Sequence, residues 1–144
     1  MDESIDANIY ARNWYLSYFG ITLPEHIKFL QKNEKIIAFT FENIGEHFGI
    51  VALKKIKNGY KPTTNFLQIF CNLAMKNFVL LDKEQAFIYA KGNDIEVRNI
   101  KIFIDKYNFN KFVAVLHNNA CLGCGFLSNE KLINQISKSR RINA

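Results

Sequence analysis

The stretch from Lys111 to Ala144 constrains the fold more than any other part of the sequence. It begins with an apolar run, KFVAVL, which is followed by the polar residues HNN and a glycine-punctuated apolar run, ACLGCGFL. Two apolar runs of strand length that are joined by a short polar turn predict a β-hairpin. A segment with several Lys and Arg side chains comes after the hairpin. The sequence therefore predicts a strand pair that leads into a basic, anion-attracting segment.

The first sixty residues predict two helices and two strands. Ser4 and Asp6 are typical helix caps, and apolar residues near helical spacing follow them up to a stop at Gly20. Pro24 suits the first position of a second helix, PEHIKFLQKN. The segments KIIAFTFE and FGIVALKKI are rich in β-branched and aromatic residues and predict strands, and NGY after the second segment predicts a turn.

Helices and strands also alternate between residue 61 and the hairpin. KPTTNFLQIFCNLAMKN predicts a helix that is capped by Thr63 or Thr64 and apolar on most sides, so we expect it to be buried or covered by a partner. DKEQAFIYAKG shows a capping box, with Asp82 as the cap and Gln85 three residues later. FVLL, DIEVRNI and KIFI predict short strands. This order predicts an α+β fold with a small barrel-like sheet.

Charge is distributed unevenly along the 144 residues. The formal net charge is +6, and the balance of Lys and Arg against Asp and Glu is −3 over residues 1–50 and +9 over residues 51–144. A basic half beside a mildly acidic half is typical of a polyanion-binding module attached to a scaffold. The acidic N-terminal residues do not resemble a signal peptide, and the longest apolar runs are far shorter than a membrane span. We therefore expect a cytoplasmic protein.

Neither the cysteines nor the histidines predict a catalytic centre. Cys71, Cys121 and Cys124 are too few for a disulfide framework, and the CxxC pair lacks the further ligands of a structural zinc site. We interpret the pair as small residues that pack in the hairpin, and a zinc-dependent protein is a third, weaker alternative. GxGxxG, GxxxxGK[ST] and HExxH are absent from the sequence, and its three histidines have no evident nucleophile or carboxylate partner. We expect no enzyme activity, no cofactor and no metal.

The basic residues are a stronger indication of function. Two groups are dense enough to neutralise several phosphates if they converge on one face. The first comprises Lys131, Lys138, Arg140 and Arg141, with Asn134 as a hydrogen-bonding neighbour, and the second comprises Lys54, Lys55 and Lys61.

From Lys61 onwards the order of motifs resembles a known family. KPTTNFLQIF, KNFVLLDKEQAFIYAKGNDI and LGCGFLSNEKLINQISKSRR resemble the PUA-like RNA-binding C-terminal region of Sun/Fmu-type RNA 5-methylcytosine methyltransferases. The second and third motifs also resemble the Nip-seven-like ribosome-biogenesis proteins, which pair an α/β N-terminal domain with a PUA domain. The resemblance implies an α/β domain over residues 1–60 and a PUA-like RNA-binding β-barrel over residues 61–144.

Individual positions can be carried over from the family's motifs. The matching positions are Leu122, Gly123 and Gly125 in a structural glycine turn, and Asn134, Lys138 and Arg141 in the basic motif. The sequence departs from the pattern at Ser137, where the family has proline, and at Phe126, where lysine is frequent. The Pro-Cys motif of the methyltransferase nucleophile is absent.

The main hypothesis is a non-enzymatic RNA-binding protein that acts on ribosomal or transfer RNA, in ribosome biogenesis or as an accessory to an RNA methyltransferase. The alternative is a protein-interaction scaffold that docks on an RNA-modifying enzyme or a ribosomal protein. The alternative rests on the apolar helix Asn65–Ala74, which could serve as a docking surface.

Overall fold

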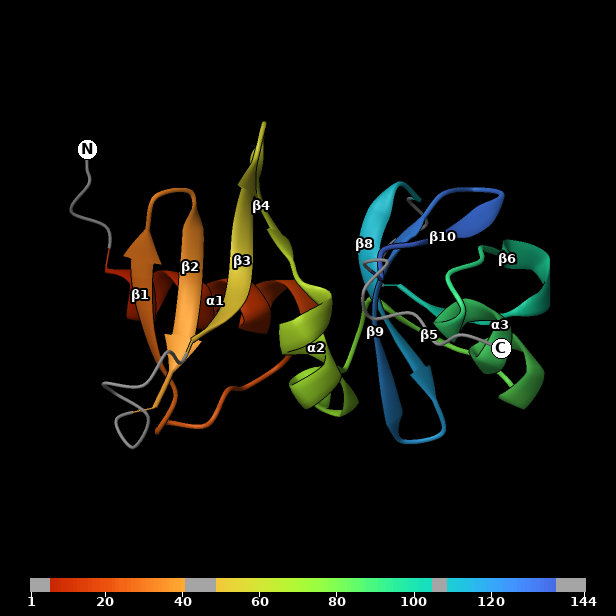
Figure 1. Ribbon diagram of the computed structural model, residues 1–144, viewed down its shortest axis with the longest axis horizontal. Coiled ribbons are helices and arrows are strands. Elements are labelled where there is room, and N and C mark those ends of the chain that lie inside the picture. Colours follow the sequence, from red (N-terminus) through yellow and green to blue (C-terminus); the bar gives the residue numbers. More distant parts are fainter. Residues whose placement is uncertain (1–5, 41–48, 105–108, 137–144) are drawn as a thin grey trace.

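The computed structural model describes residues 6–40, 49–104 and 109–136. Two β-sheets lie side by side along the long axis, with helix α2 between them (Figure 1). The N-terminal elements are α1 (Ala7–Phe19), β1 (Lys28–Lys32), β2 (Lys35–Phe39), β3 (Ile50–Ile56), β4 (Gly59–Pro62) and α2 (Thr64–Phe70). The others are η2 (Cys71–Leu73), β5 (Phe78–Leu80), α3 (Lys83–Ala90), β6 (Ile95–Glu96), η3 (Val97–Asn99), β7 (Lys101–Phe103), β8 (Lys111–His117), β9 (Ala120–Leu127) and β10 (Lys131–Asn134). The predicted α+β class is confirmed.

The first sheet is an antiparallel meander in the order β1-β2-β3-β4, with α1 packed against it. The predicted ends of α1 are confirmed. Asp6 accepts hydrogen bonds from the backbone N–H groups of Asn8 and Ile9, and Gly20 ends the helix at φ +71°, a conformation that glycine adopts without strain. Ala7, Ala11, Tyr15 and Phe19 are buried at a spacing of four residues. They form one stripe of the helix and anchor it to the core.

The helix predicted from Pro24 is wrong, because this region contains strand β1. The guanidinium of Arg12 donates hydrogen bonds to the carbonyls of Leu23 (3.1 Å) and Pro24 (3.0 Å), groups that a helix would have used internally. Asn33, at φ +58°, then turns the chain directly into β2. Tertiary hydrogen bonds and a tight turn therefore override the helical spacing of the apolar residues.

Helix α2 connects the two sheets. Thr63 caps it, as one of the two predicted alternatives, by accepting a hydrogen bond from Phe66 N (3.2 Å). Phe66 and Leu67 are fully buried in a core cluster that includes residues of both sheets, whereas Ile69 is 50% exposed. The helix is therefore largely a core element. Strand β4 belongs to the first sheet, so the expected domain boundary between residues 60 and 61 falls within a strand.

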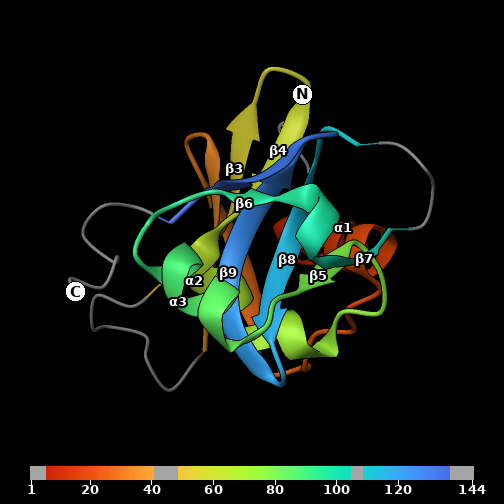
Figure 2. The same ribbon diagram turned by 90° about the vertical axis from the view of Figure 1, so that its right-hand side faces the viewer.

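The second sheet is curled and has the order β6-β10-β9-β8-β5-β7. Figure 2 shows the predicted hairpin, β8 and β9, at its centre. Helix α3 has the predicted reciprocal capping box: Gln85 N donates to Asp82 Oδ1 (2.7 Å), and Asp82 N donates to Gln85 Oε1 (2.9 Å). Tyr89 of α3 is buried in a second core cluster.

Over the described ranges, no helix combines the length and apolar character that crossing a bilayer would require.

Candidate nucleic-acid interface

Four lysines form a row across the first sheet, one on each strand. Lys32 lies opposite Lys35, Lys35 opposite Lys54, and Lys54 opposite Lys61. Directly opposed residues of antiparallel strands project to the same face, so all four side chains share one face. With neighbouring strands about 4.8 Å apart, the row spans about 14 Å. We call these four residues the lysine row.

A bulge in β3 places Lys54 in this row. Ile37 pairs with Val51 and Ile36 pairs with Leu53, so Ala52 is an extra residue without a partner on β2. The carbonyl oxygen of Ala52 accepts a hydrogen bond from Tyr15 Oη of α1 (2.5 Å). Without the extra residue, the side chain of Lys54 would point to the opposite face of the sheet.

Three members of the row line a polar cleft at the junction of the two sheets. The volume of this cleft is about 270 Å³. Its walls are formed by Lys35, Lys54 and Lys61, together with Val51, Pro62, Thr63, Thr64, Asn65, Cys124 and Gln135. Cys124 and Gln135 come from the second sheet and the segment after it, so both halves of the chain build the cleft.

The lysine row has no acidic counterpart. Among the described residues, no carboxylate lies within salt-bridge distance of any of the four ammonium groups. Like charges placed directly opposite each other destabilise a strand pair. An anion bound along the row would remove this repulsion, which makes the cleft suited to a polyanion.

Lys61 reaches into the cleft. Its ammonium group lies 5.7 Å from the centre of the Phe112 ring, in cation–π geometry. Burial raises the pKa of the Cys124 thiol from 9.0 to about 12, and the nearby Lys61 cation offsets only part of that rise. The thiol is therefore protonated near neutral pH and is not a nucleophile.

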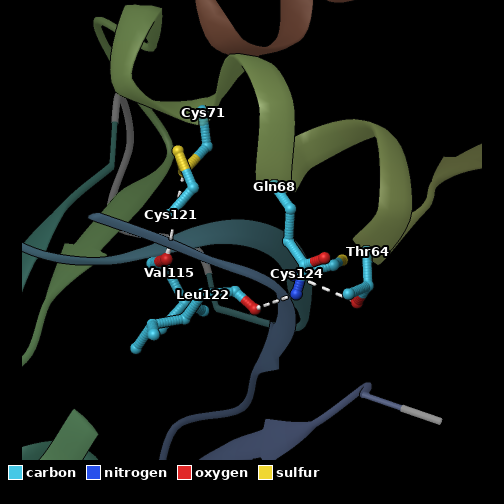
Figure 3. Close-up of a disulfide and its surroundings, with 7 residues drawn as sticks. All are labelled: Thr64, Gln68, Cys71, Val115, Cys121, Leu122 and Cys124. Atoms are coloured by element: carbon cyan, nitrogen blue, oxygen red, sulfur yellow. Dashed lines mark hydrogen bonds between the residues drawn. A yellow bond between two sulfur atoms is a disulfide. The ribbon is translucent and has the colours of Figure 1, made fainter. Parts of the chain in front are cut away.

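The cysteines differ from our expectation, because Cys71 and Cys121 form a disulfide (Figure 3). Their Cα atoms are 5.8 Å apart, although 50 positions separate them in the sequence. The packing of α2 and η2 on β9 brings them together. Bonded in this way, Cys121 cannot ligate zinc with Cys124. The part of the chain that the structure describes contains no group of three or more His, Cys, Asp or Glu side chains able to hold a metal ion.

Leu122, Gly123 and Gly125, predicted as a structural turn, lie within strand β9 instead. The two glycines allow neighbouring elements to approach β9 closely and do not reverse the chain. A Cβ atom on Gly123, which has φ +129°, would lie 2.6 Å from Thr64 Cγ2, and one on Gly125 would lie 2.6 Å from a methyl carbon of Leu132. The absence of a side chain at these positions allows α2 and β10 to pack directly against β9.

Hydrogen bonds fix α2 to β9 beside the cleft (Figure 3). Thr64 Oγ1 accepts a hydrogen bond from Cys124 N (3.2 Å) and donates one to Gln135 O (3.3 Å). Gln68 Nε2 donates to Leu122 O (3.1 Å). These contacts set the position of the cleft wall relative to the lysine row.

The other predicted contact residues do not join the row. Lys55 lies opposite Tyr60 on the face that carries α1, because the Tyr60 ring contacts Tyr10 of that helix. Lys131 pairs with Glu96 at the distant end of β10 and lines a separate depression with Glu96 and Glu130.

The side chain of Asn134 holds local structure together. Its amide group donates hydrogen bonds to the carbonyls of Tyr89 (2.7 Å) and Asn93 (3.0 Å), and its Oδ1 accepts one from Ile136 N (2.8 Å). Both amide hydrogens are therefore already used, and Asn134 fixes β10 against α3.

Lys138, Arg140, Arg141 and Ser137 lie outside the described residues. The last described stretch before them includes Gln135, which lines the cleft. Lys32 and Lys35 were missed in the sequence. The only indication of their role was their position around the Asn33 turn, and recognising it requires the strand register.

The comparisons with known proteins support the fold. No protein-family model matches the sequence, and no curated protein matches it. The fold is similar to a solved structure described as a conserved PUA domain protein from Thermoplasma acidophilum. The TM-score is 0.59 at 12% sequence identity, and the alignment covers 95% of each chain. This likeness confirms the predicted PUA-like fold.

Proposed function

We propose that the protein binds RNA, without catalysing a reaction on it, through the lysine row and the cleft beside it. The carrying observation is that four lysines share one face without a carboxylate partner among the described residues. Such a row suits a chain of phosphate groups, because lysine ammonium groups bind phosphates as point charges. The PUA-like fold, together with the motif resemblance to RNA-binding PUA-like regions, supports RNA over other polyanions.

The finer assignment follows from the motif resemblance in the second half of the chain. We propose ribosomal or transfer RNA as the ligand, with a role in ribosome biogenesis or beside an RNA methyltransferase. Lys138, Arg140 and Arg141 would add phosphate contacts, because the described chain before them passes the cleft at Gln135. Lys55 and Lys131 would contribute only long-range attraction.

The alternative of a protein-docking scaffold rested on the apolar helix Asn65–Ala74. Phe66 and Leu67 of this segment are buried inside the molecule, so most of its apolar surface is already used. Ile69 and Leu73 are 50% and 45% exposed, which leaves a smaller apolar surface than the sequence suggested. RNA binding is the better-supported function.

Binding of a labelled tRNA at about 0.1 M salt tests this proposal. The variant Lys35→Gln/Lys54→Gln/Lys61→Gln should bind at least about tenfold more weakly, because it loses three phosphate contacts. The matched control is Lys83→Gln/Lys91→Gln/Lys101→Gln, which removes the same charge from exposed positions on and near α3 and β7. It should bind the tRNA far more tightly than the variant of the lysine row does. Equal losses in both variants would show that net charge, and not the row, attracts the RNA. Lys138→Ala/Arg141→Ala tests the basic segment separately.

A further inference from the structure

Helix α1 has an aromatic stripe that packs against the core on one side and stays partly exposed on the other. Tyr10, Trp14 and Tyr18 recur every four residues and are only half-buried. Together with Asp6, Ile9, Asn13 and Ser17 they line a shallow groove of about 660 Å³. This volume lies within the range of about 300–1,000 Å³ that is usual for small-ligand sites.

The rings are arranged as an incomplete stack. Trp14 and Tyr18 are parallel, with an interplanar angle of 5° and centroids 4.7 Å apart. Tyr10, one turn earlier, is tilted against Tyr60 instead, with centroids 5.3 Å apart. No described ring stacks on the other side of Trp14 in the same parallel manner. A planar aromatic ligand could therefore extend the stack.

Polar groups in the groove match the edges of nucleobases. Asn13 and Ser17 are exposed, and neither side chain has a hydrogen-bond partner among the described residues. An amide and a hydroxyl can both donate and accept hydrogen bonds, as base edges require. The one carboxylate that lines the groove, Asp6, caps α1 through the N–H groups of Asn8 and Ile9.

A cation lies beside one end of the stripe. At the Tyr10 end, the contacting residue Tyr60 precedes Lys61 in the chain, but the Lys61 side chain projects to the opposite face of the sheet. At the other end, Tyr18 Oη donates to Phe112 O (2.8 Å), and the ammonium group of Lys61 lies over the Phe112 ring. Strand β4, which carries Lys61, is an edge strand of the described sheet.

Lys111 adds a second cation beside Tyr18. Its ammonium group hydrogen-bonds Asn77 Oδ1 (3.3 Å), and Asn77 Nδ2 donates to the carbonyl of Tyr18 (2.6 Å). Aromatic rings flanked by lysines are the combination that holds single-stranded nucleic acids, whose bases stack while their phosphates are neutralised. An apolar peptide would gain nothing from this charge.

We infer that the aromatic stripe of α1 stacks unpaired bases of single-stranded RNA, whose phosphates continue over the edge of β4 to Lys61 and the lysine row. This inference rests on the proposed RNA binding and specifies the RNA: an unpaired segment and not a continuous duplex. Bases inside a duplex are stacked on each other and cannot reach the rings.

Trp14 is the only tryptophan of the chain, so its fluorescence reports on the groove directly. A nine-nucleotide oligouridine should quench its emission, and a blunt, G·C-rich RNA duplex that stays fully paired at the temperature of the assay should not. Anisotropy of the labelled oligouridine should show about 5- to 150-fold weaker binding to Trp14→Leu, the ratio that corresponds to one lost stacked base. Trp14→Phe, which keeps a ring, should recover most of the affinity. If Trp14→Leu does not fold, the affinity of Tyr10→Leu for the labelled oligouridine and the quenching of Trp14 in the wild-type protein provide the same test.

The failures are distinguishable. Unchanged affinity of Trp14→Leu together with weakened binding by the Lys35/Lys54/Lys61 variant would overturn the stacking site and leave RNA binding intact. Failure of the wild-type protein to bind any RNA would overturn both. A change in Trp14 emission when the protein alone is concentrated would assign the stripe to a second copy of the chain and overturn the inference.

Discussion

Reduction of the Cys71–Cys121 disulfide should destabilise the fold by a predictable amount. The bond joins residues 50 positions apart. In the chain-entropy relation, a cross-link that closes a loop of this length removes about 14 cal/mol/K from the unfolded chain, or about 4 kcal/mol at 25 °C. For a chain of this size, that difference corresponds to a fall in Tm of about 10–15 °C.

Urea denaturation of the oxidised and reduced protein, followed by circular dichroism, measures the difference. Mass spectrometry after thiol labelling should first show a single reactive cysteine in the unfolded oxidised protein. The double variant Cys71→Ala/Cys121→Ala is the control, because reductant should not alter its stability. If the oxidised protein contains the disulfide and reduction changes the free energy of unfolding by less than about 1 kcal/mol, the loop-closure argument is refuted.

Three further predictions follow from single positions. The Cys124 thiol should resist iodoacetamide in the folded protein at pH 8. Its folded pKa of about 12 exceeds its ordinary value of 9.0, so the stability that the protonated thiol contributes is complete below pH 9 and should fall as pH rises toward 12. Denaturation at several pH values measures this fall. Gly123→Ala should lower the free energy of unfolding by about 2 kcal/mol or more, through backbone strain and a clash with Thr64. Gly59 has φ +122° and open space around it, so Gly59→Ala should show the effect of backbone strain alone. Asn134→Ala should cost about 2–3 kcal/mol of unfolding free energy by leaving backbone groups unpaired, while the folded variant binds RNA as the wild type does.

Local chemistry explains which elements the sequence predicted correctly. The caps of α1 and the capping box of α3 depend on residues within one turn of each helix, and both were predicted. The helix at Pro24 was wrong because Arg12, a dozen residues away, binds the carbonyls there. Propensity and spacing contain no information about such a tertiary contact.

The candidate site was predictable only in part for the same reason. Lys54 and Lys61 were identified from their clustering in the sequence, but the lysine row needs the register around Asn33 and the extra residue at Ala52. A shift of one residue would have sent Lys54 to the opposite face. The disulfide requires two segments 50 residues apart to meet, which spacing alone does not indicate.

The salt dependence of RNA affinity tests the central claim most directly. Each single-stranded phosphate contact contributes about −0.7 to the slope of log K against log salt concentration, so the four lysines of the row predict a slope of about −3 or steeper. Replacing Lys35, Lys54 and Lys61 by glutamine should make the slope shallower by about 2. A flat salt dependence of the wild-type protein, or an unchanged slope in this variant, would contradict RNA binding by the lysine row.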